Sequence, residues 1–174
     1  MVKRKEHVMK AKLRPEDIYS KQLSWLCIEP MLVSVRGRDM AAKTEIYRQL
    51  HEGQQALFLF YSYHNHTKSL AEFYWFSAYN IIEIKSWNGI KKGMHFFHLD
   101  EMVTVLDQIE ILITEKNKVD DEWREVLPTD LEKDPILLQR TEALYAAYQI
   151  VAEAAITHMN KMILQNQEMY LEVE

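Results

Sequence analysis

The fold is decided by one stretch, residues 135–167, which reads PILLQRTEALYAAYQIVAEAAITHMNKMILQNQ. Pro135 suits the first turn of a helix, because the N–H that it lacks would have no intrahelical acceptor there. No glycine or proline follows it before the end of the chain. Apolar side chains recur every three or four positions along one stripe, which consists of Leu144, Tyr148, Val151, Ala155, Met159 and Met162. This spacing predicts one long helix from Pro135 to about Gln167.

This long helix also predicts self-association. The face opposite the apolar stripe is polar and carries Glu142, Gln149, Glu153, Asn160 and Lys161. Roughly thirty helical residues extend about 45 Å, and the other helices expected in the chain are shorter. We therefore expect the far end of the stripe to stay uncovered in a single chain. The simplest way to bury it is against its own copy, so the sequence predicts a homodimer through the C-terminal helix.

A second helix is expected at the centre of the domain. Residues 69–72 read Ser-Leu-Ala-Glu, which is a capping box. Residues 70–84 place apolar side chains on all sides of a helix, as is typical of a helix that is surrounded by others. We predict a core helix over Ser69–Trp87, which Asn-Gly at residues 88–89 ends. A loop that contains Gly93 should follow it.

The segments around this core helix also indicate helices. Pro15 should begin one, and Pro30 should end it, with residues 31–35 as a connection. Asp39 is a suitable N-cap for the next helix. Asp100 is a suitable N-cap for a helix that ends near residues 116–118.

Residues 56–63 are ambiguous, because their aromatic side chains favour a strand while a buried helix fits equally well. We interpret them as a helix because both neighbouring segments are helical, with Gly53 at the end of the preceding one. The predicted fold is therefore all-α: a single-domain helical bundle of about five or six helices with a long C-terminal helix.

The composition supports this class. The chain has only four glycines and four prolines in 174 residues, whereas an all-β fold needs frequent turns. Cys27 is the only cysteine, which excludes an internal disulfide and fits a small buried hydrophobe. We see no secretory signal and no apolar run long enough to cross a bilayer. The expectation is a cytoplasmic protein without a membrane segment.

The formal net charge of −5 is unevenly distributed. Residues 1–14 form a basic arm, which we expect to be flexible, and residues 15–174 form the single α-helical domain. The arm carries Lys3, Arg4, Lys5, Lys10, Lys12 and Arg14 against one acid, Glu6. Since the domain itself is acidic and phosphate contacts dominate nucleic-acid affinity, nucleic acid is an unlikely partner. A regulator that binds nucleic acid through the arm is the least favoured hypothesis.

Several common chemistries are missing from the sequence. The glycines at 37, 53, 89 and 93 form no phosphate-binding loop. The sequence contains neither a Gly-x-Ser-x-Gly elbow nor a Cys-x-x-Cys pair. No histidine is preceded three residues earlier by glutamate, which argues against a ferritin-like di-iron site. We therefore assign no catalytic residue, cofactor or metal.

Four histidines leave one alternative open. His64 and His66 lie between two apolar segments, and His95 and His98 precede a helix close to Asp100. If they converged, three imidazoles and a carboxylate could hold Zn²⁺, Ni²⁺ or Fe²⁺. A metal-dependent enzyme is therefore the alternative. The leading hypothesis is a non-enzymatic interaction or regulatory protein that acts by protein–protein binding or self-association.

Overall fold

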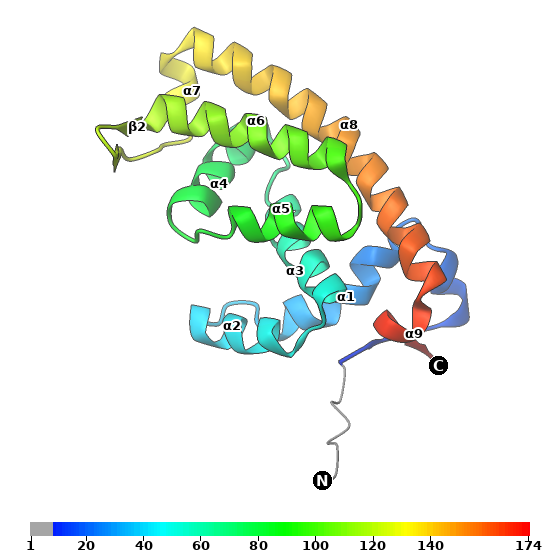
Figure 1. Cartoon of the computed structure of the whole chain (residues 1–174). Helices are drawn as coiled ribbons and strands as arrows, with labels where there is room; N and C mark the ends of the chain where they lie inside the picture. Colours follow the sequence, from blue (N-terminus) through cyan, green and yellow to red (C-terminus); the bar gives the residue numbers. More distant parts are fainter. Residues whose placement is uncertain (1–8) are drawn as a thin grey trace.

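Nine α-helices, one 3₁₀ helix and four short strands make up residues 9–174, the part of the chain that this computed structural model describes (Figure 1). In chain order they are β1 (Ala11–Leu13), η1 (Pro15–Tyr19), α1 (Leu23–Ser34), α2 (Met40–Gln49), α3 (Glu52–His64), α4 (Leu70–Ile82), α5 (Trp87–Phe96), α6 (Asp100–Asn117), β2 (Lys118–Val119), β3 (Glu122–Trp123), α7 (Asp130–Lys133), α8 (Pro135–Gln165), α9 (Gln167–Tyr170) and β4 (Leu171–Val173). The predicted all-α class is confirmed. The helices are more numerous than the five or six expected in the sequence analysis.

The long C-terminal helix is confirmed as α8, which has 31 residues. The Asp134 carboxylate caps it by accepting hydrogen bonds from the backbone N–H groups of Ile136 and Leu137, at 3.1 and 3.0 Å. In Figure 1, α8 runs across the whole molecule, beside α6 at its start and past α1 towards α9 at its end. An ion pair of 2.8 Å between Arg140 and Glu115 joins α8 to α6.

The expectation that the far end of the apolar stripe is uncovered was wrong. Tyr148, Ala155 and Met159 are all buried within the chain. Tyr148 packs against Tyr63 of α3 and Phe73 of α4, and α1 lies against α8 near Asn160. Asn160 fixes the contact, because its amide accepts the backbone N–H of Ser24 at 2.8 Å and donates to the carbonyl of Lys21 at 2.8 Å.

The predicted core helix Ser69–Trp87 is correct at its start and too long at its end. The Ser69 hydroxyl caps α4 by accepting the backbone N–H of Glu72. The helix ends at Ile82, and Lys85 adopts a left-handed φ of 57°. The turn is closed by Ser86, whose hydroxyl donates to the side-chain carbonyl of Asn80 at 2.7 Å.

The expected loop around Gly93 is in fact helix α5, which also contains Gly89. Helix α5 packs closely on α3. A Cβ atom at Gly93 would lie only 2.8 Å from Cα of Ala56, and one at Gly89 would lie 2.7 Å from a methyl group of Leu59. The two glycines therefore allow α3 and α5 to approach each other closely, and they do not interrupt helix α5.

The prediction that Pro30 ends the first helix was wrong, because Pro30 lies inside α1. Pro30 is exposed, while Cys27, Ile28 and Met31 are buried. Burial of these side chains outweighs the hydrogen bond that proline removes. Residues 31–35, predicted as a connection, consequently continue the helix to Ser34.

Residues 56–63 are helical, as predicted, and belong to α3. Gly53 lies in the first turn of α3 and not at the end of α2, because His51 caps α3. Asp39 caps α2 as predicted, by accepting the backbone N–H of Ala42 at 2.9 Å. Asp100 is the first residue of α6 and makes no capping bond.

The boundary predicted at residue 14 does not match the folded part. Residues 1–8 of the predicted arm lie outside the described residues. Residues 11–13 form β1, which pairs in parallel with β4 at the C-terminus. Ala11 and Leu13 are buried, because the strand packs against α1. Across residues 9–174 we find no helix that combines the length and apolarity needed to cross a membrane.

Candidate interaction surface

The structure does not bring the four singled-out histidines together. His64 ends α3 and His66 follows it, whereas His95 is in the last turn of α5. His98 lies in the turn before α6, with a left-handed φ of 56°. Within residues 9–174, no three His, Cys, Asp or Glu side chains are grouped closely enough to hold a metal ion.

His66 and His95 have different surroundings. His66 packs on the ring of Phe76, with centroids 4.6 Å apart. His95 is exposed and lies 3.9 Å from the carboxylate of Asp100. The aromatic residues that the sequence places around His64 fill the core, where Phe60, Tyr63 and Phe73 are fully buried.

His64 belongs to this core. Its Nδ1 is hydrogen-bonded to the hydroxyl of Tyr148 at 2.9 Å, and its ring stacks on Phe60 at 5.1 Å. Burial, aided by the charge of Lys68, lowers the pKa of His64 to about 4. The imidazole is therefore neutral at pH 7 and suits a structural position that joins α3 to α8.

We expect this histidine to make folding stability depend on pH. Because its pKa in the folded protein is about 4, against about 6.5 when unfolded, the unfolded chain binds the proton more tightly. The contribution of neutral His64 to the free energy of unfolding should be at its maximum above pH 6.5. It should fall by about 2–3 kcal/mol as the pH drops towards 4. Denaturant unfolding at pH 7 and pH 4.5 measures this change.

His64→Gln is the matched control, because glutamine keeps a hydrogen-bonding group and does not titrate. The variant should lose most of the difference in stability between the two pH values. An unchanged difference would show that other groups cause it.

The surface with the clearest features is on the side of α8 that faces away from the core. We define the outer face of α8 as Ile150, Glu153, Ala154, Thr157 and Lys161. These residues are spaced by three or four positions, so one side of the helix presents them all. All five are exposed, and Ile150 is 73% exposed.

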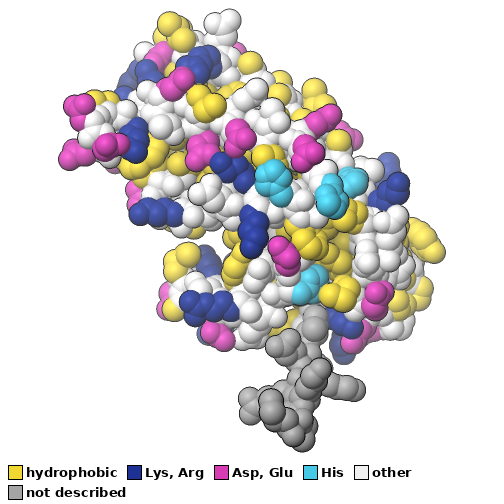
Figure 2. All heavy atoms as spheres, viewed as in Figure 1, with side chains coloured by type: hydrophobic (Ala, Val, Ile, Leu, Met, Phe, Trp, Pro, Cys, Tyr) yellow, Lys and Arg dark blue, Asp and Glu magenta, His cyan; other side chains and the backbone are white. Residues whose placement is uncertain are grey.

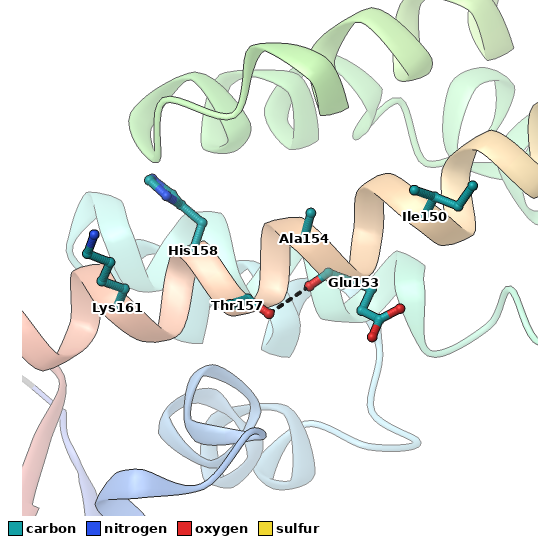
Figure 3. Close-up of a pocket in the computed structure, with 6 residues that line it drawn as sticks. All are labelled: Ile150, Glu153, Ala154, Thr157, His158 and Lys161. Carbon is teal, nitrogen blue, oxygen red and sulfur yellow. Dashed lines mark hydrogen bonds between the residues drawn. The ribbon is translucent and has the colours of Figure 1, made fainter.

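A shallow hollow of about 560 Å³ lies along this face (Figure 3). The outer face lines it together with His158. In Figure 3, the side chains of Ile150, Ala154 and His158 project in the same direction from α8. The hydroxyl of Thr157 is occupied by a hydrogen bond of 3.1 Å to the backbone carbonyl of Glu153. The hollow is therefore lined by the apolar Ile150 and Ala154 together with the polar or charged Glu153, Thr157, His158 and Lys161.

A second hollow, of about 450 Å³, adjoins the first and shares Glu153, Thr157 and Lys161 with it. It lies between α8 and the segment around η1. Its remaining lining residues are Ile18, Tyr19, Ser20, Lys21, Ile156, Asn160 and Leu164. The two hollows form one continuous surface across α8, and apolar side chains line both of its halves.

Glu153 and Lys161 form no ion pair with any residue from 9 to 174 (neither occurs among the pairs within 4.0 Å). Within residues 9–174, some charges of the helical body are paired, such as Lys91 with Asp107 at 3.1 Å, and others, such as Arg36 and Lys43, form no ion pair either. On the side of the molecule shown in Figure 2, lysine and arginine side chains are scattered among acidic ones. The charges of the outer face are thus available to a partner.

His158, at the edge of the first hollow, has an unsatisfied group. Its Nε2 is buried and is the single side-chain nitrogen or oxygen of this kind in residues 9–174 that lacks a hydrogen-bond partner. Buried polar atoms are nearly always hydrogen-bonded. Among residues 9–174, the Nε2 atom of His158 is therefore an exception to this rule.

The sequence predicts a polar face on this side of α8. The predicted interface was the stripe from Leu144 to Met162, of which Tyr148, Ala155 and Met159 are buried, whereas Leu144, Val151 and Met162 are partly buried. The signal that could have found the outer face is Ile150, a large apolar residue that lies outside the apolar stripe.

The basic arm gives no support to the nucleic-acid hypothesis in its described part. Lys12 lies 3.9 Å from the carboxylate of Glu174, and Arg14 contacts Asp17 at 3.1 Å. These cations already have acidic neighbours. The other basic residues of the arm, apart from Lys10, lie outside the described residues.

Comparison with known proteins identifies no relative: no family model, no curated protein and no solved structure matches this chain.

Proposed function

We propose that this chain is a non-enzymatic interaction protein of the cytoplasm, and that it binds another protein through the outer face of α8. The observation that carries the proposal is Ile150, which is 73% exposed on a helix whose other side is buried. A single exposed apolar residue is ordinary. Here it lies beside two hollows that continue the apolar surface to Ile156 and Leu164.

The arrangement has the parts of a protein-binding surface. It combines the apolar side chains of Ile150 and Ala154 with the charged side chains of Glu153 and Lys161, and protein interfaces likewise combine apolar and polar groups. The face lies on a rigid helix, so binding it costs little ordering of the backbone. The hollows are shallow and open, which suits a protein side chain better than an enclosed small molecule.

A photo-cross-linking residue at position 150 tests this function without assuming a partner. Benzoylphenylalanine replaces Ile150 in the full chain, and intact producing cells are irradiated. We expect a discrete adduct, whose mass identifies the bound protein. The control carries the same residue at Met40, which is 55% exposed on α2, far from α8. Equal or absent labelling at the two positions would contradict the proposal.

A further inference from the structure

We infer that the partner at the outer face of α8 is a second copy of this chain, paired antiparallel about a two-fold axis through Thr157. The inference rests on the proposed function, since it names the occupant of the same surface. Its basis is that the outer face is complementary to itself in charge and in shape.

The charges are placed symmetrically. Glu153 and Lys161 lie at equal distances in sequence on either side of Thr157. In an antiparallel pair of helices, residues equidistant from the axis face each other. Glu153 of one copy therefore meets Lys161 of the other, and the two-fold axis repeats the pair.

The two charges cannot satisfy each other within one copy. Eight residues of helix separate their positions by about 12 Å, and neither has another ionic partner in residues 9–174. Exposed ion pairs add little affinity, but they exclude wrong registers because like charges would then face each other. Glu153 and Lys161 thus select the antiparallel register.

The apolar groups follow the same symmetry. Ile150 and Leu164 also lie at equal distances from Thr157. The exposed Ile150 of one copy is brought to the second hollow of the other, which Leu164, Ile156 and Ile18 line. Ala154 and Thr157 near the axis are small, so the helices can approach closely. Each copy supplies one apolar side chain and one hollow, which is the requirement of an isologous contact.

Charge reversal tests the register. Light scattering of the full wild-type chain should report twice the chain mass of 20.7 kDa. Glu153→Lys places a new lysine opposite Lys161 of the other copy, and Lys161→Glu makes two glutamates face each other. Each single variant should dimerise about tenfold or more weakly than wild type. Both positions are exposed, and circular dichroism should show unchanged helix content.

The decisive sample is an equimolar mixture of the two single variants. One copy then carries two lysines and the other two glutamates on the same face, so a mixed dimer restores both ion pairs. We expect native mass spectrometry to show this mixed dimer in excess over either homodimer. Glu142→Lys is the control for net charge, because Glu142 is exposed on α8 outside the outer face. It should leave the dimer intact.

The outcomes separate the inference from the proposed function. A wild-type chain that stays at 20.7 kDa, or a mixture that forms no mixed dimer, overturns the pairing about Thr157. If the cross-linker at position 150 then captures a different protein, the binding function stands and the identity of the partner is wrong. If position 150 captures nothing, both are wrong.

Discussion

Met159→Glu is expected to unfold the protein. Met159 is 0% exposed and lies on the side of α8 that packs into the core. A glutamate there would bury a carboxylate or a carboxyl group that has no hydrogen-bonding or ionic partner. Burying an unpaired ionisable group belongs to the few mechanisms that cost about 4 kcal/mol or more. Chemical denaturation should show a large loss of unfolding free energy, or no cooperative transition.

Ile150→Glu is the matched control on the same helix. It introduces the same side chain in place of an apolar one, at a position that is 73% exposed. Its stability as a single chain should change by about 0.5 kcal/mol or less, while its association should weaken. Equal losses of stability in the two variants would contradict the assignment of buried and outer faces of α8.

This pair of variants also shows where the sequence analysis was wrong. The stripe through Met159 was interpreted as an interface, so Met159→Glu would have been expected to separate two folded copies. A periodic apolar stripe shows which side of a helix is buried, but not whether the same chain or another one buries it. Helices α1, α3 and α4 together bury residues of this stripe. The end of α1 could not be predicted correctly because Pro30 was interpreted as a stop.

The long-range errors have a common cause. Pro30 and Gly93 are predicted from the sequence as breaks in helices, because local propensity disfavours both residues. In the structure, burial next to Pro30 and the close approach of Gly93 to Ala56 outweigh that propensity. Both effects depend on a neighbour far away in the sequence. By contrast, the start of α8 was predicted correctly because Asp134 and Pro135 determine it locally.

The candidate surface could be predicted only in part. The sequence places Glu153 and Lys161 on the side of the C-terminal helix opposite the stripe, and both are exposed. That this helix takes part in binding stays a prediction. The sequence could not show that η1 folds beside α8 and completes the second hollow. Nor could it show that the histidines separate, because a spacing along the chain does not fix which ends of helices meet.

Phe73→Ala is the substitution that tests the centre of the fold. Phe73 is 1% exposed in α4, and its ring packs against Tyr145 and Tyr148 of α8, with centroids 4.9 and 5.4 Å away. Removing the ring leaves a cavity between two helices whose positions are fixed by other contacts. We expect a loss of about 3–5 kcal/mol in unfolding free energy, measured by chemical denaturation with helix content followed by circular dichroism.

Two positions of the same helix calibrate this loss. Tyr79 is 36% exposed, so Tyr79→Ala should cost about 1 kcal/mol. Ile81 is half-buried, and Ile81→Ala should fall between the two. The order matters because α4 was predicted from the sequence to be apolar on all sides, which would make the three positions equivalent. If the three losses were equal, α4 would be surrounded uniformly and its contact with α8 would not be the one that holds the core together.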